Sequence, residues 1–207
     1  MPRFYLDIET APLEWNPDKP NDISIIADPS KNKIITIQFQ PIAYDTGKPT
    51  DELTILKEWE SSEEEIVKEF AKKFVPCDTD HNLDVWKFVP VGNNLDFEMI
   101  HLLPKLQKYC NIELDAFGKP TIDVKPILIT VNKGKFTGYS KVLGKNGKAS
   151  NIASWYYSKD YDSILDYIVE ETENFLEGYQ LLCYKLPMLK RNLESLGHAP
   201  TGLDDLR

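Results

Sequence analysis

Two acidic residues stand two positions apart in an apolar segment near the start of the chain. Asp7 and Glu9 alternate with apolar residues over positions 4–10, a pattern that predicts a β-strand. Because strand side chains alternate between the faces of a sheet, both carboxylates are expected on one side. Adjacent carboxylates repel unless a cation lies between them, and Mg²⁺ and Mn²⁺ prefer oxygen ligands. The pair predicts half of a metal site, the alternative being a solvent-exposed strand end.

A further carboxylate follows a second apolar run. Asp96 lies in the segment Gly92-Asn-Asn-Leu-Asp-Phe, between an expected strand and an expected helix. Gly92 allows the backbone to turn, and Asn93 or Asn94 suits a loop or helix-cap position. We predict Asp96 as a second part of the metal site. The alternative is an acidic residue that only interacts with the helix dipole.

The third candidate is a tyrosine–glutamate pair in the last long amphipathic segment. Tyr167 and Glu171 are four positions apart, so they share one face of the expected helix. This face overlaps the apolar stripe through Ile164 and Ile168. We therefore expect a phenol and a carboxylate that point towards the sheet. An ordinary amphipathic helix with an acidic first half is the alternative.

Together and in this order, the three segments resemble the motifs of the DEDD superfamily of 3'–5' exonucleases. The matching residues are Asp7-Ile-Glu-Thr, Gly92-Asn-Asn-Leu-Asp96-Phe and the pair Tyr167 and Glu171. The likeness is to the proofreading branch and its stand-alone relatives, whose third motif is Tyr-x-x-x-Asp, and it covers roughly residues 3–180. The chain departs from the pattern at Glu171, where the family has Asp.

The third motif has alternative registers. Asp166, with Tyr161 five positions before it, has the spacing of the His-type variant of the family, and Asp162 is a further candidate. We favour Glu171 because its helix face continues the apolar stripe, whereas Asp166 lies to one side of it.

The resemblance implies an α/β, RNase H-like fold with a two-metal-ion active site. The implied ligands of two divalent cations, Mg²⁺ or Mn²⁺, are Asp7, Glu9, Asp96 and Glu171. Asp7 would bridge both ions, and Tyr167 would orient the attacking water. The implied reaction is hydrolysis of terminal phosphodiester bonds at the 3' end of single-stranded DNA or RNA, with DNA favoured, to release nucleoside monophosphates.

Two other functions stay open. Glutamate is one methylene longer than aspartate, so Glu171 also fits a catalytically silent nucleic-acid-binding module on the same fold. An unrelated α/β protein with chance motifs is the third alternative.

A lysine-rich segment precedes the third motif. Residues 124–159 contain seven lysines and no acidic residue, with aromatic residues between them. Cations that meet phosphates and rings that stack on bases suit a single-strand contact surface. The predicted nucleic-acid contacts are Lys133, Lys135, Phe136, Tyr139 and Lys141. A solvated lysine-rich loop is the alternative.

The remaining patterns predict the elements that position these residues. The expected strands are 4–10, 34–40, 53–59, 88–92 and 121–131. The expected helices are about 62–74, 97–109, 162–179 and 186–197. Short connections between the first three strands favour an antiparallel meander. We predict one domain over residues 1–207, with a central mixed sheet of three antiparallel and then two parallel strands, flanked by helices.

The composition of the chain bears on its partners and on its cellular compartment. The formal net charge is −9. A polymerase or repair protein that docks on the acidic surface stays a possible partner, as does a second copy of the chain. No apolar run approaches the roughly 18 residues that span a bilayer, so no membrane is expected. Three cysteines, odd in number and far apart, do not suggest a disulfide framework and indicate a reducing, cytoplasmic compartment.

Overall fold

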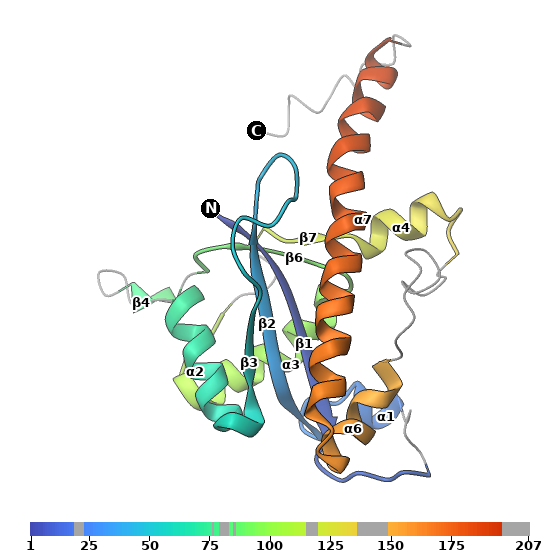
Figure 1. The fold of residues 1–207 in the computed structure, drawn as a ribbon. Helices are drawn as coiled ribbons and strands as arrows, with labels where there is room; N and C mark the ends of the chain where they lie inside the picture. Colours follow the sequence, from blue (N-terminus) through green and yellow to red (C-terminus); the bar gives the residue numbers. More distant parts are fainter. Residues whose placement is uncertain are drawn as a thin grey trace.

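A five-stranded mixed sheet forms the centre of the computed structural model (Figure 1). The structure describes residues 1–18, 23–75, 77–78, 83–84, 86–114, 120–135 and 149–195. The sheet has the strand order β3-β2-β1-β6-β7. Its strands are β1 (Arg3–Pro12), β2 (Asn32–Ile42), β3 (Thr54–Lys57), β6 (Val89–Gly92) and β7 (Ile122–Asp123).

The strand directions confirm the predicted arrangement of the sheet. β2 runs antiparallel to both β1 and β3, whereas β6 runs parallel to β1 and β7 runs parallel to β6. In the β1–β2 ladder, Asp7 lies opposite Gln38 and Glu9 lies opposite Thr36. The register shifts between Glu9 and Thr10, immediately after the second carboxylate.

Helices cover both faces of the sheet. Helices α2 (Glu63–Phe74) and α3 (Leu95–Cys110) lie on one face, and α7 (Tyr161–Ser195) crosses the other (Figure 1). Leu6 and Ile8 of β1 belong to the core beneath α2 and α3. Tyr5 packs with residues of α7, as the alternation of strand side chains requires. Asp7 and Glu9 therefore belong to the face that α7 covers.

Shorter elements complete the described chain. They are α1 (Ile23–Ile26), the 3₁₀ helix η1 (Glu58–Glu60), the two-stranded ladder β4 (Cys77–Asp78) and β5 (Leu83–Asp84), α4 (Lys125–Val131), η2 (Ala149–Asn151) and α6 (Ile152–Ser158). Among the described residues, no helix combines the length and the apolar character needed to cross a bilayer.

The predicted fifth strand over 121–131 is wrong for most of its length. Only Ile122–Asp123 pairs with β6, and the chain then turns into the helix α4. The β-branched residues of this segment favour a strand, but Pro126 occupies the first turn of the helix, where proline is well tolerated. The predicted third strand similarly ends early, at Lys57, and continues as η1.

The two helices predicted at 162–179 and 186–197 form one continuous helix, α7. Pro187 lies inside it. Proline cannot donate the backbone hydrogen bond to the carbonyl four positions earlier, yet the helix continues past this residue. The C-terminal half of α7 instead extends beyond the sheet as a single rod (Figure 1). Residues 196 and 197 lie outside the described residues.

Candidate metal centre

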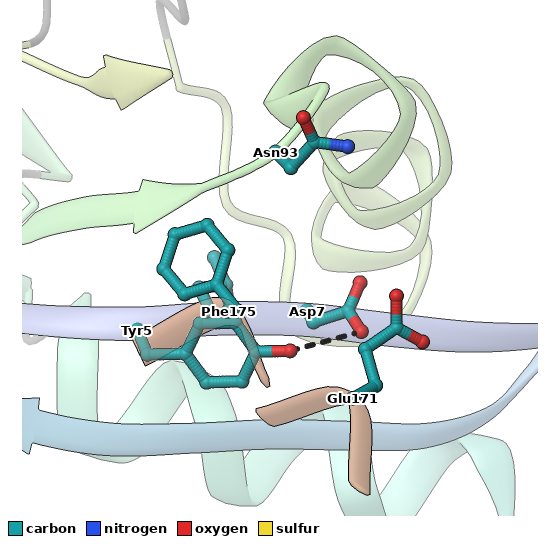
Figure 2. Close-up of a pocket in the computed structure, with 6 residues that line it drawn as sticks. Tyr5, Asp7, Asn93, Glu171 and Phe175 are labelled. Carbon is teal, nitrogen blue, oxygen red and sulfur yellow. Dashed lines mark hydrogen bonds between the residues drawn. The ribbon is translucent and has the colours of Figure 1, made fainter. Parts of the chain in front are cut away.

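Asp7 is held in place by a hydrogen-bond network that begins in the sheet. Gln38, its cross-strand partner, donates from Nε2 to Asp7 Oδ2 over 3.0 Å, and Thr36 donates to Gln38 Oε1 over 2.9 Å. The Tyr5 hydroxyl donates to the same Asp7 oxygen over 3.2 Å (Figure 2). Gln38 and Thr36 are completely buried, so these bonds fix the carboxylate without competition from water.

Three carboxylates converge where β1 meets α7. Asp7, Glu9 and Glu171 each offer an oxygen, and these oxygens all lie within 4.8 Å of one another. In Figure 2 the carboxylates of Asp7 and Glu171 lie side by side. So close a group of negative charges is costly without protons or a cation. The oxygen donors fit Mg²⁺ or Mn²⁺, which makes these three residues the candidate ligands.

Tyr167 lies beside this group on α7. Its side chain is only 4% exposed. Burial raises the pKa of its phenol far above the ordinary value, and the charges of Glu9 and Glu171 and a hydrogen bond with Glu171 raise it further. The phenol therefore stays protonated over the whole neutral range and can act as a hydrogen-bond donor.

In the structure it is Glu98, and not Asp96, that lies next to the cluster of three carboxylates. Two positions on a helix are separated by about 200°, so the two side chains of α3 point in nearly opposite directions. The Asp96 side chain is exposed, whereas Glu98 is 3% exposed and lines the same cleft as Asp7. The placement of Asp96 in the site is corrected accordingly.

Burial of Glu98 has a strong electrostatic effect. Desolvation raises the pKa of its carboxyl group well above the usual range, and the charge of Asp7 and a hydrogen bond with it raise the pKa further. Its Oε2 atom is buried without a hydrogen-bond partner in the described part of the chain. An unsatisfied buried carboxyl oxygen next to Asp7 fits the coordination of a cation.

A signal for Glu98 was present in the sequence. The buried residues Leu95, Leu102 and Leu106 of α3 recur at helical spacing, and position 98 lies on the same stripe. An acidic residue on an apolar stripe is a stronger indication of a site than an acidic residue in the first turn.

Asp123 holds the start of α3. Its carboxylate, at the end of β7, accepts hydrogen bonds from the backbone nitrogens of Asn94 over 2.8 Å, Leu95 over 3.0 Å and Lys125 over 2.9 Å. Asn94 adopts a left-handed conformation with φ of 70°, and the Lys125 ammonium donates to its side-chain oxygen. These bonds fix the helix that carries Glu98.

A cleft of about 770 Å³ opens beside the carboxylates. Its polar lining includes Asp7, Glu9, Glu98, Glu171, Tyr167, Asn93, Asn94 and Lys125. Its apolar lining includes Ile8, Pro12, Ile26, Phe97, Ile152 and Ala153. Asn93 faces the Asp7–Glu171 pair from the loop that precedes α3 (Figure 2). Among the described residues that line the cleft, Lys125 is the only cation.

The other predicted site residues lie elsewhere. Lys133 and Lys135 are exposed beyond the C-terminal end of α4 and do not line the cleft. Phe136, Tyr139 and Lys141 lie outside the described residues. The alternative ligands Asp162 and Asp166 have exposed side chains and are not part of the cluster of carboxylates. The residue of α7 that belongs to this cluster is Glu171.

Comparison of the chain with known protein families and with curated protein sequences gives no match.

Proposed function

We propose that this chain is a metal-dependent 3'–5' exonuclease with an RNase H-like fold. The observation that carries the proposal is the convergence of Asp7, Glu9 and Glu171 beside the buried phenol of Tyr167. These residues come from a central strand and a distant helix, and they line a cleft large enough for a nucleotide.

The carboxylates would hold the cations. Asp7, Glu9 and Glu171 are the principal ligands, and Glu98 takes the role that the sequence motif suggested for Asp96. Mg²⁺ or Mn²⁺, when bound, supplies a water of lowered pKa and stabilises negative charge on the phosphate and the leaving oxygen. Gln38 and Tyr5 keep Asp7 oriented by donating to one of its oxygens.

Tyr167 would orient the attacking water. In the metal-free protein the raised pKa keeps the proton on the phenol at neutral pH, which favours a role as hydrogen-bond donor. A fixed hydrogen-bond donor next to Glu9 and Glu171 can still align a water molecule with a phosphorus atom.

The cleft suits the end of a single strand. Its apolar side, with Phe97, Ile26 and Ile152, can accept an unstacked base, while Asn93 and Lys125 can contact sugar or phosphate. The bound cations would offset the negative charge of the carboxylates that line the cleft. The acidic net charge of the chain therefore does not oppose a nucleic-acid substrate.

The test is degradation of a 5'-labelled single-stranded DNA and of its RNA counterpart. Wild type and Asp7→Ala are compared with Mn²⁺ or Mg²⁺ and with EDTA. A metal-dependent ladder of shortened products, absent from Asp7→Ala, supports the exonuclease and identifies the sugar that it accepts. No cleavage of either strand by the wild type contradicts it.

One outcome would favour the silent binding module. Glu171 is longer than the aspartate of the family pattern, which motivates this second function. If the wild type binds the strand without cleaving it, the binding module is the function that the result supports. Glu171→Asp is then the variant in which cleavage should be sought.

A further inference from the structure

Two aromatic rings form a stacked pair beside Pro12, at the end of β1. The rings of Trp15 and Tyr157 are parallel within 8°, with centroids 5.8 Å apart. The Tyr157 hydroxyl donates to the carbonyl of Pro12, and Pro12 itself lines the cleft. The pair is therefore connected directly to the end of the strand that carries Asp7 and Glu9.

Helix α6 also links the pair to the cleft. Ile152 and Ala153, at the start of α6, are buried and line the cleft, and Tyr157 lies about one turn further along. In Figure 1, α6 lies beside the lower end of β1. The pair therefore lies within about one helical turn of residues that line the cleft.

Neighbouring aromatic residues are occupied by internal contacts. Trp59 and Tyr161 stack with centroids 4.5 Å apart. Tyr156 lies under the Lys33 ammonium, 4.6 Å from its ring centroid, and its hydroxyl donates to Glu58 over 2.7 Å. These contacts explain the buried or half-buried state of these rings as packing.

Tyr157 is the exposed member of the Trp15–Tyr157 pair, and its ring also meets that of Tyr156 edge-on, with centroids 5.3 Å apart. Tyr157 is 40% exposed, and Trp15 is partly exposed in a loop whose neighbours Leu13 and Glu14 are exposed. In the part of the chain that the structure describes, Trp15 makes no ring contact other than the one with Tyr157. Tyr and Trp are enriched at binding interfaces, because each combines a large apolar ring with a polar group.

We propose that the Trp15–Tyr157 pair is a stacking platform for an unpaired base of the strand whose 3' end occupies the cleft. This inference rests on the proposed exonuclease function. Base–aromatic stacking tolerates every sequence because each base has a π face. The stack pre-orders both rings and so lowers the entropic cost of binding.

Charge around the pair indicates how it would bind. Glu14 and Asp160 are exposed near the two rings in sequence, with Lys159 as a neighbouring cation. This mixture does not form a phosphate-binding cluster. The platform should therefore act through ring faces, and its contribution should hardly depend on salt.

The first experiment measures equilibrium binding of a fluorescently labelled twelve-nucleotide oligothymidylate in EDTA, which separates binding from cleavage. Trp15→Ala should weaken binding about tenfold, and Trp15→Phe should restore most of it, because a ring suffices for stacking. The slope of affinity against salt should be the same in Trp15→Ala and in the wild type. Tyr184→Ala, which removes an exposed tyrosine on the far part of α7, is the matched control and should bind like the wild type.

The second experiment compares substrates of different length. The oligonucleotide can reach the platform, whereas the p-nitrophenyl ester of thymidine 5'-monophosphate occupies only the cleft. Trp15→Ala should raise the KM of the oligonucleotide about tenfold relative to the KM of the ester.

The outcomes separate the two proposals. Equal oligonucleotide affinity of Trp15→Ala and wild type overturns the platform, even if the wild type degrades the strand. Binding that depends on Trp15, with neither substrate hydrolysed by the wild type, overturns the exonuclease and leaves the platform in place. Melting temperatures of both Trp15 variants show whether a loss of binding reflects a loss of folding.

Discussion

The buried carboxyl group of Glu98 on α3 interacts with the carboxylate of Asp7 on β1. Desolvation and the charge of Asp7 both raise the pKa of Glu98. Two such groups can share a proton, or they can share a cation. This relationship links the protonation of the site to the stability of the fold, and in the proposed metal site it would link both to the affinity for a cation.

Glu98→Gln should stabilise the metal-free protein at high pH. Because the pKa of Glu98 is raised in the folded state, the folded protein binds its proton more tightly than the unfolded chain does, and stability falls as the pH rises from the ordinary glutamate pKa of 4.5 through the folded pKa. Glutamine resembles the protonated form at every pH. Melting of both proteins in EDTA between pH 5 and pH 9 should show an advantage of the variant that grows with pH. A constant difference would contradict the raised pKa.

Divalent cations should stabilise the wild type and should not stabilise Asp7→Asn. Mn²⁺ at a hundredfold excess over its Kd should add about 2.7 kcal/mol to the free energy of unfolding. Calorimetric melting with Mn²⁺ and with EDTA measures this effect. Asp96→Asn is the matched control, since its side chain is exposed on the opposite side of α3. Loss of the metal effect in Asp96→Asn would restore Asp96 as a ligand.

Tyr167→Phe should lower kcat by about a hundredfold with little change in KM, as expected for a group that aligns the reacting water. The kcat and the KM are the two quantities compared, since bound cations would offset the carboxylate charges that help to raise the pKa of this phenol in the metal-free protein. Steady-state kinetics measure both quantities. Tyr161→Phe tests the alternative register and should retain activity, because the Tyr161 ring packs on Trp59.

Asp123→Ala should destabilise the fold by about 1–2 kcal/mol, the usual effect of losing a helix cap. Its carboxylate accepts two backbone hydrogen bonds at the start of α3. The same change should weaken Mn²⁺ binding, because α3 carries Glu98. Urea unfolding and metal titration measure the two effects. Asp123→Asn keeps an acceptor and should be affected less in both.

Lys105→Met should destabilise the protein by about 3–5 kcal/mol, because it leaves a nearly buried carboxylate without its ion pair. Lys105 lies 2.9 Å from Glu63 Oε1 and also donates to the Asn32 carbonyl over 3.1 Å. Urea unfolding of the single variant and of the double variant with Glu63→Gln checks the cause. The double variant should recover part of the loss, and failure to do so would point to packing instead.

Local patterns were sufficient for the parts of the site that lie within one element. Strand alternation predicted that Asp7 and Glu9 share a face, and helical spacing predicted that Tyr167 and Glu171 do. The antiparallel directions of the first three sheet strands followed from their short connections. These features depend on backbone geometry that every sequence shares.

Other features depended on contacts between distant segments. Segment 121–131 has the composition of a strand, but only Ile122–Asp123 finds a pairing partner, and the rest becomes α4. The apolar patterns predicted two helices, yet α7 is continuous and contains Pro187. In both places weak local preferences are overruled by the energy of packing or by hydrogen bonds along a longer element.

The choice between Asp96 and Glu98 could not be made from the sequence alone. It determined that an acidic residue follows β6 on a helix, and the prediction from the sequence was Asp96. The rotation of α3 about its axis decided which acid meets Asp7. That rotation is determined by the packing of Leu102 and Leu106 into the core and by Asp123 at the start of the helix. Only the tertiary structure contains these contacts, because they join segments that are far apart in the chain.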